Sequence, residues 1–168
     1  MSPGIPETHP VATPPGGAGG PAYWLASLGG VGRFPFASGT AGSAAALLLW
    51  WAAQRTAGNW GVLGLAALLA LAGTWAAGRL AAALRIQDPS VVVVDEAAGM
   101  VLTLAFLPPS WPVVAGGFFL FRILDVLKPW PADAAEKLPG GIGIVADDLV
   151  AALYANLILR IAVLAFSI

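Results

Sequence analysis

Five apolar segments, separated by short polar stretches, limit what this chain can fold into more than any other feature. In chain order the segments cover residues 39–53, 62–80, 90–107, 111–127 and 149–168. The second approaches the ~20 residues needed to cross the hydrocarbon of a bilayer. Only 10% of the residues are charged, against about 25% in a typical soluble domain, and the mean hydropathy is +0.82. We therefore predict an all-α membrane protein, a bundle of about five apolar helices with several short or re-entrant segments.

The N-terminal tail, residues 1–21, differs from the rest because proline and glycine dominate it. Such a composition cannot bury an apolar core, so we predict a disordered tail. The single histidine, His9, lies in this tail and is expected to be solvated and inert. Residues 22–168 are predicted to form the membrane-embedded domain, which opens with either a short interfacial helix around Trp24 or an ordered loop.

The polar groups lie between the apolar segments and are predicted to meet at one membrane face. If successive segments alternate in direction, the groups at 39–43, 88–96, 125–128 and 147–148 all fall on the same side. Most cations share that side: Arg33, Arg79, Arg85, Lys128 and Lys137. Only Arg55 and Arg160 fall on the other side. Because Lys and Arg concentrate in cytoplasmic loops, we predict that the carboxylate face is cytoplasmic.

Local signals predict where the helices begin and how they are joined. Asp88 fits an N-cap and Pro89 a first turn for a helix over 90–107, which would place Asp88 and Asp95 on one face. Residues 54–59 predict a polar turn, and residues 140–143 a glycine-rich loop that could approach a phosphate. Because the third and fourth segments are short, a re-entrant hairpin is the alternative to two full crossings.

The charged stretches contain the groups that phosphate chemistry needs. Carboxylates gathered at one depth repel in low dielectric, so cations must offset them. Hard oxygen ligands, without cysteine or a usable histidine, favour Mg²⁺ over Zn²⁺, and a metal with Lys and Arg suits phosphate chemistry. The groups concerned are Asp95, Glu96, Asp125, Asp147, Asp148, Arg122 and Lys128.

Several classes of protein are excluded, and some alternatives stay open. Without cysteine there is no cysteine phosphatase, and without a usable histidine there is no Ser-His-Asp triad. No P-loop motif is present, and a net charge of −1 offers no basic face for nucleic acid. The alternatives are structural ion pairs and helix caps, an ion- or proton-coupled transporter that uses the intramembrane carboxylates, and a structural subunit without a site.

Four motifs occur in a fixed order along residues 34–157: Gly39-Thr40-x-Gly42-Ser43; Asp88 with Val94-Asp95-Glu96-x-x-Gly99-Met100; Phe121-Arg122-Ile123-Leu124-Asp125 through Lys128-Pro129-Trp130-Pro131; and Gly140-Gly141-x-Gly143-Ile144 with Asp147-Asp148. This combination resembles the phosphatidylglycerophosphatase A family, and its Lys-Pro-Trp-Pro block is the most distinctive part. The chain departs from the family at Ser38 and Ala41, where relatives often carry Pro and a bulky residue, but no charged position is lost.

The resemblance implies a membrane-bound, Mg²⁺-dependent lipid phosphatase. It would convert phosphatidylglycerophosphate to phosphatidylglycerol and inorganic phosphate in the bacterial cytoplasmic (inner) membrane, with its site facing the cytoplasm. The expected partners are this lipid and the membrane, with a second copy of the chain left open and no nucleic acid. A metal-activated water is the preferred nucleophile, and an Asp that forms a phosphoryl-enzyme is the alternative.

The expected site residues fall into three overlapping sets. The catalytic set is Asp95, Glu96, Asp125, Lys128, Asp147 and Asp148. The metal set is Asp95, Glu96, Asp125 and Asp148, of which Asp95 and Asp148 are the preferred direct ligands. The phosphate-binding set is Arg122, Lys128, Thr40, Ser43 and Gly141.

Overall fold

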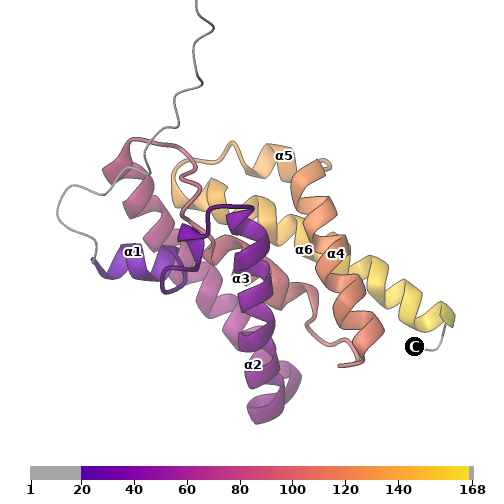
Figure 1. Cartoon of the computed structure of the whole chain (residues 1–168). Coiled ribbons are helices and arrows are strands. Elements are labelled where there is room, and N and C mark those ends of the chain that lie inside the picture. The colour runs from indigo at the N-terminus through magenta and orange to yellow at the C-terminus, as the bar shows by residue number, and fades with distance from the viewer. Residues whose placement is uncertain (1–19, 167–168) are drawn as a thin grey trace, which may run out of the picture.

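The structure, a computed structural model, describes residues 20–166, and every regular element in that range is a helix (Figure 1). The elements are α1 (Pro21–Ala26), the 3₁₀ turn η1 (Val31–Arg33), α2 (Ser38–Leu84), α3 (Val94–Thr103), α4 (Trp111–Leu127), α5 (Ala132–Ala135) and α6 (Gly141–Phe166). The all-helical prediction is confirmed. Residues 1–19 of the predicted tail, with His9, lie outside the described residues, and Pro21 is already the first residue of α1.

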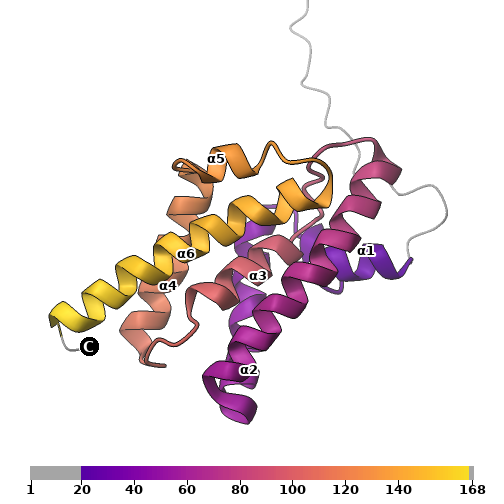
Figure 2. The same cartoon turned by 180° about the vertical axis from the view of Figure 1, so that it is seen from behind.

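The long element α2 consists of two helical arms that meet at Gly58. The backbone there has φ 62° and ψ −156°, which is not helical, and glycine adopts a positive φ without steric cost. In Figures 1 and 2 the chain turns back at this point, at the end of the molecule away from α5. The polar turn predicted over residues 54–59 is therefore a turn at one residue, with helix on both sides.

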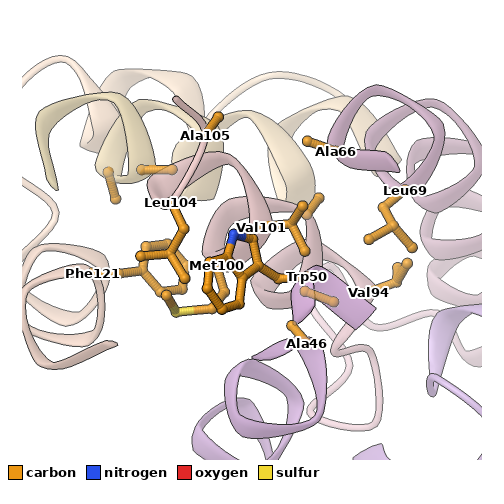
Figure 3. Packing of buried hydrophobic residues seen from close by; sticks show 14 of the residues in the cluster. Ala46, Trp50, Ala66, Leu69, Val94, Met100, Val101, Leu104, Ala105 and Phe121 are labelled. Carbon is orange, nitrogen blue, oxygen red and sulfur yellow. The ribbon is translucent and has the colours of Figure 1, made fainter. Parts of the chain in front are cut away.

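Helix α3 lies at the centre of the bundle, packed against α2, α4 and α6. Figure 3 shows Met100 of α3 and its C-cap residue Leu104 beside Phe121 of α4 and Trp50 of α2. Phe121 and Met100 are both completely buried. Gly99 is required for this packing, because a Cβ atom there would lie 2.6 Å from Cζ of Phe121. The close contacts fix α3, and with it the acidic residues at its N-terminal end.

The predicted start of this central helix was wrong. Helix α3 begins at Val94 with Val93 as its N-cap, so neither Asp88 nor Pro89 belongs to it and Asp88 does not share a helix face with Asp95. The cause is a tertiary contact: the Val93 N–H donates to the carbonyl of Ala26 at 2.9 Å. That bond and a run of β-branched valines keep the preceding segment out of the helix.

The predicted glycine-rich loop at residues 140–143 was also wrong, because α6 begins at Gly141 rather than near Leu149. A Cβ atom at position 141 would overlap the carbonyl oxygen of Thr74 in α2. Gly141 therefore serves the close approach of two helix backbones. Asp147 and Asp148 consequently lie about two turns into α6, not at its cap.

Two helices, α2 and α6, are long and apolar enough to cross a membrane, judged by length and composition. Helix α3 has 10 residues and so covers about 15 Å at 1.5 Å per residue, half of the ~30 Å hydrocarbon layer. Short segments were expected for this part of the chain, and α3 is one of them.

Asn156 of α6 stabilises the opposite end of α3, and its loss is the first testable change. Its amide donates to the carbonyls of Thr103 and Ala105 at 2.8 and 2.9 Å. We expect Asn156→Ala to lower the free energy of unfolding by roughly 1–3 kcal/mol, because a buried carbonyl loses its donor. Thermal unfolding in detergent would measure the loss. Activity per folded molecule should stay unchanged, and a selective loss of activity at full stability would contradict this structural role.

Candidate active site

Three carboxylates form the core of the site. Asp95 and Glu96 come from the first turn of α3 and Asp148 from α6, and one oxygen from each lies within 4.8 Å of the others. Asp95 and Asp148 are 7% and 4% exposed. One oxygen in each of the three carboxylates is buried without a hydrogen-bond partner. We call Asp95, Glu96 and Asp148 the acidic cluster.

The environment of the acidic cluster opposes its negative charge. Burial raises the pKa of Asp95. Burial also raises the pKa of Glu96 well above its usual range, and repulsion from Asp95 adds to this effect. A bound cation would reverse both effects, because it favours the charged form of each carboxylate. The donor set, oxygen only, suits a hard divalent ion.

Arg122 of α4 lies beside the cluster and pairs chiefly with Asp125. Its guanidinium Nη1 donates to the Asp125 carboxylate one turn further along the same helix and lies 4.0 Å from Oε1 of Glu96. Asp125 therefore belongs to an ion pair at the edge of the acidic cluster. The sequence predicted that Arg122 and Asp125, three residues apart, lie on one face of the helix, and the ion pair between them confirms this.

Lys128, the C-cap of α4, connects two other elements to the site. Its Nζ lies 2.7 Å from Oδ2 of Asp147 in α6 and 3.0 Å from Oε1 of Glu136, just after α5. Burial lowers the pKa of Lys128, but the hydrogen bonds to Asp147 and Glu136 outweigh it and raise the pKa above its ordinary value. Lys128 therefore remains protonated at neutral pH.

A cavity of about 190 Å³ lies next to Glu136 and Asp147, the two carboxylates that pair with Lys128. Its polar lining comes from Gln87 and Asp88 before α3, from Glu136, and from Asp147. Asp147 is 5% exposed, and its Oδ1 has no hydrogen-bond partner. The cavity is large enough for a small polar group and lies beside a fixed positive charge.

Gly39, in the first turn of α2, is packed against the acidic cluster. A Cβ atom there would overlap Oε1 of Glu96 and lie 3.0 Å from Nη2 of Arg122. We expect Gly39→Ala to displace the Glu96 carboxylate and, if Glu96 is a metal ligand as predicted, to lower kcat/KM about tenfold. Because that carboxylate can rotate away, the thermal stability should change little.

The control for Gly39→Ala is Gly64→Ala, a helical glycine in the same element where an added Cβ atom would have nothing within 4 Å. Alanine is favoured over glycine inside a helix by about 1 kcal/mol, so Gly64→Ala should be fully active and slightly more stable. Steady-state phosphate release and thermal unfolding of both variants separate the two effects. Equal activity in both variants would show that the backbone at position 39 does not position Glu96.

The remaining predicted phosphate ligands are placed differently from one another. Thr40 is exposed in the first turn of α2. Ser43 is completely buried, and its hydroxyl donates to the carbonyl of Gly39 at 3.0 Å. Gly141 is buried against α2. Their binding of phosphate remains a prediction, and for Ser43 it would require exchange of an existing hydrogen bond.

The structural alternative accounts for only part of the charged residues. Arg122 with Asp125 and Lys128 with Asp147 are ion pairs, as that alternative expects. The acidic cluster is different, because its three carboxylates share one weak contact with a cation, at 4.0 Å, among the described residues. Glu136 is the partner that the sequence did not reveal. The only feature of the sequence that pointed to Glu136 is its position in the polar stretch after the Lys-Pro-Trp-Pro block.

The fold and the site together define a class: a helical enzyme of phosphate chemistry, with buried carboxylates beside fixed cations. Comparison with known proteins agrees. The family described as phosphatidylglycerophosphatase A matches residues 24–163. The chain therefore belongs to the phosphatidylglycerophosphatase A family and is a phosphoric monoester hydrolase.

Three curated relatives have similar identities. A protein of Bacteroides thetaiotaomicron, provisionally named phosphatidylinositol-3-phosphatase, is 38% identical over 79% of this chain and 87% of its own length. Phosphatidylglycerophosphatase A of Escherichia coli K12 is 38% identical over 78% of this chain and 77% of its own length. Phosphatidylglycerophosphatase A of Haemophilus influenzae is 36% identical over 82% of this chain and 86% of its own length. No solved structure matches the chain.

Proposed function

We propose that this chain is a Mg²⁺-dependent phosphatase that hydrolyses phosphatidylglycerophosphate to phosphatidylglycerol and inorganic phosphate at the cytoplasmic face of the inner membrane. The observation that carries the proposal is the acidic cluster, whose buried carboxylates have oxygens without partners. The family and two of the three relatives support the choice of lipid. The transporter alternative is not favoured, because the carboxylates gather at one end of the bundle.

The residues fit a magnesium ion by their chemistry. Asp95, Glu96 and Asp148 offer hard oxygen ligands close enough to share one ion. Leaving these buried oxygens without a partner is costly, and a cation would satisfy all three at once. When bound, Mg²⁺ supplies Lewis-acid polarisation of the phosphoryl oxygens.

The chain's own cations would hold the phosphate and offset its growing charge. Arg122 uses Nη1 for Asp125, so other N–H groups of its five-donor fork remain for phosphate oxygens. Lys128 donates to two carboxylates, which leaves one of its three N–H bonds for the substrate. Because its pKa is raised, Lys128 acts as a fixed positive charge rather than as a proton donor.

In the hydrolysis itself, water attacks phosphorus and the P–O bond to the glycerol carbon chain breaks. The bonding electrons remain on the glycerol oxygen, which takes up a proton and leaves as the hydroxyl of phosphatidylglycerol. One proton of the attacking water passes to a carboxylate of the site, which returns a proton to the leaving glycerol oxygen. The cavity beside Lys128, with Gln87 and Asp88 in its wall, has the polar lining that a glycerol hydroxyl needs.

The distribution of positive charge supports the proposed orientation. Lys128 and Lys137 lie at the end that carries the acidic cluster. Arg160 lies at the other end of α3, where it donates to the carbonyl of Ala105 at 3.0 Å. The excess of cations on the carboxylate side supports a cytoplasmic site.

Phosphate release in uncharged detergent tests the proposal. Wild-type protein is expected to hydrolyse phosphatidylglycerophosphate with Mg²⁺ and to lose this activity in EDTA, with recovery on adding Mg²⁺ back. Phosphatidylinositol 3-phosphate is the parallel substrate, because one relative carries that name. Release from the inositol lipid alone would replace the proposed substrate. Full activity in EDTA would overturn the metal requirement.

A further inference from the structure

A second cavity, lined by tryptophans and a few polar groups, lies at the end of the bundle away from the acidic cluster. Its volume is about 480 Å³, and it lies between the first arm of α2, near the turn at Gly58, and the start of α4. Its lining includes Trp50, Trp51, Gln54, Arg55, Pro109 and Trp111. No carboxylate lines it, in contrast to the cavity beside Lys128.

Buried polar atoms at this cavity have no partner within the described part of the chain. Trp50 is 5% exposed and lines the cavity, and its indole Nε1 makes no hydrogen bond. The amide oxygen of Gln54 and the hydroxyl of Ser110 are also buried and unpaired. The Gln54 oxygen is an acceptor, whereas the Trp50 N–H and the Ser110 O–H are donors. A buried donor without a partner costs about 1–3 kcal/mol, so a molecule that accepts hydrogen bonds from these two groups would be stabilising.

The charges around this cavity favour an anion. Arg55 makes no ion pair with a carboxylate among residues 20–166, and its guanidinium lies 5.4 Å from the ring centroid of Trp51. The 17-residue helix α4 begins here, and its N-cap Ser110 makes no capping hydrogen bond. The N-terminus of a helix carries partial positive charge and free N–H groups.

The geometry points to a binding site for the phosphate of an anionic phospholipid, separate from the active site and independent of the proposed reaction. Arg55, the indole N–H of Trp50 in the cavity wall and the start of α4 supply the donors; Pro112, the second residue of α4, contributes no N–H. Phosphate binding at helix N-termini follows the same physics. A lipid is favoured over free phosphate because Trp51 and Trp111 at the rim are 57% and 79% exposed. Exposed tryptophans of this kind lie at the headgroup level of membranes.

Binding to the full chain in uncharged detergent and EDTA tests this site with three probes. Dioctanoyl phosphatidylglycerol carries chains and phosphate, inorganic phosphate carries no chains, and dioctanoylglycerol carries no phosphate. Calorimetry measures the affinity, and the ligand-induced rise of Tm provides a second readout. The variants are Arg55→Gln and Trp50→Phe, with Arg79→Gln as the matched control, because Arg79 also stacks on a tryptophan, Trp75, at 5.9 Å.

We expect saturable binding of the anionic lipid that weakens at least fivefold in Arg55→Gln and in Trp50→Phe and is unchanged in Arg79→Gln. Any lipid bound at the acidic cluster would bind equally to the wild type and to all three variants, so it would not contribute to the difference in affinity between them. Equal affinity for inorganic phosphate with the same dependence on Arg55 would assign the site to the free ion. Equal binding of dioctanoylglycerol, or an affinity that neither variant changes, would overturn the site. Because the readout is binding, these outcomes are independent of whether the chain hydrolyses phosphatidylglycerophosphate.

Discussion

Asp95→Asn is expected to reduce phosphate release from phosphatidylglycerophosphate by about 10³-fold, the largest loss from any single change. If Asp95 is a ligand of the proposed Mg²⁺, its loss removes several kcal/mol of transition-state stabilisation, and each 1.36 kcal/mol is a factor of ten. The same change should raise the stability of the metal-free protein, because it removes one of three buried carboxylates that repel one another within 4.8 Å. Activity and stability should therefore move in opposite directions.

Phosphate release with Mg²⁺ and thermal unfolding in EDTA measure the two effects of Asp95→Asn. The control is Asp133→Asn, whose side chain is 47% exposed and pairs with Lys137 at 3.5 Å, outside the acidic cluster. That control should keep its activity. A fully active Asp95→Asn enzyme would remove Asp95 from the site, and a parallel fall in activity and stability would show that Asp95 is chiefly structural.

Lys128→Met is expected to lower kcat/KM by about 10²-fold and the free energy of unfolding by roughly 3 kcal/mol. Activity falls because a fixed charge beside the phosphate is lost. Stability falls because Asp147, whose side chain is 6% exposed, keeps its charge without its partner. Lys137→Met is the control, since the Lys137 side chain is 75% exposed and pairs with a half-exposed carboxylate.

The double variant Lys128→Met, Asp147→Asn separates the two roles of this lysine. Neutralising both partners leaves no unpaired buried charge, so much of the stability should return. Activity should stay low, because the positive charge of Lys128 is still missing. Recovery of activity together with stability would mean that Lys128 serves only to neutralise Asp147.

The sequence predicted how the polar groups meet better than it predicted where the helices begin. Alternating apolar segments require that Asp95 and Asp148 reach the same end of the bundle, and the structure brings them together with Glu96. This part was predictable because it depends only on the direction of the chain. The pair between Arg122 and Asp125 was predictable from their helical spacing.

The parts that could not be predicted depend on contacts between distant segments. The start of α3 depends on a hydrogen bond from Val93 to Ala26, and the start of α6 on the approach of Gly141 to Thr74. No local signal contains either contact. For the same reason the sequence did not reveal that Lys128 pairs with Glu136. Asp125 pairs with Arg122, and its role as a metal ligand stays a prediction.

The position of Asp148 on the last helix has a consequence for biosynthesis. Asp95 and Glu96 leave the ribosome before α6. Asp148, the third carboxylate of the acidic cluster, joins them only when α6 has been made and packed against α3. Synthesis runs from the N-terminus at about 5–20 residues per second. A partly made chain therefore has only two of the three carboxylates, and the enzyme should acquire its activity late, once its final helix is in place.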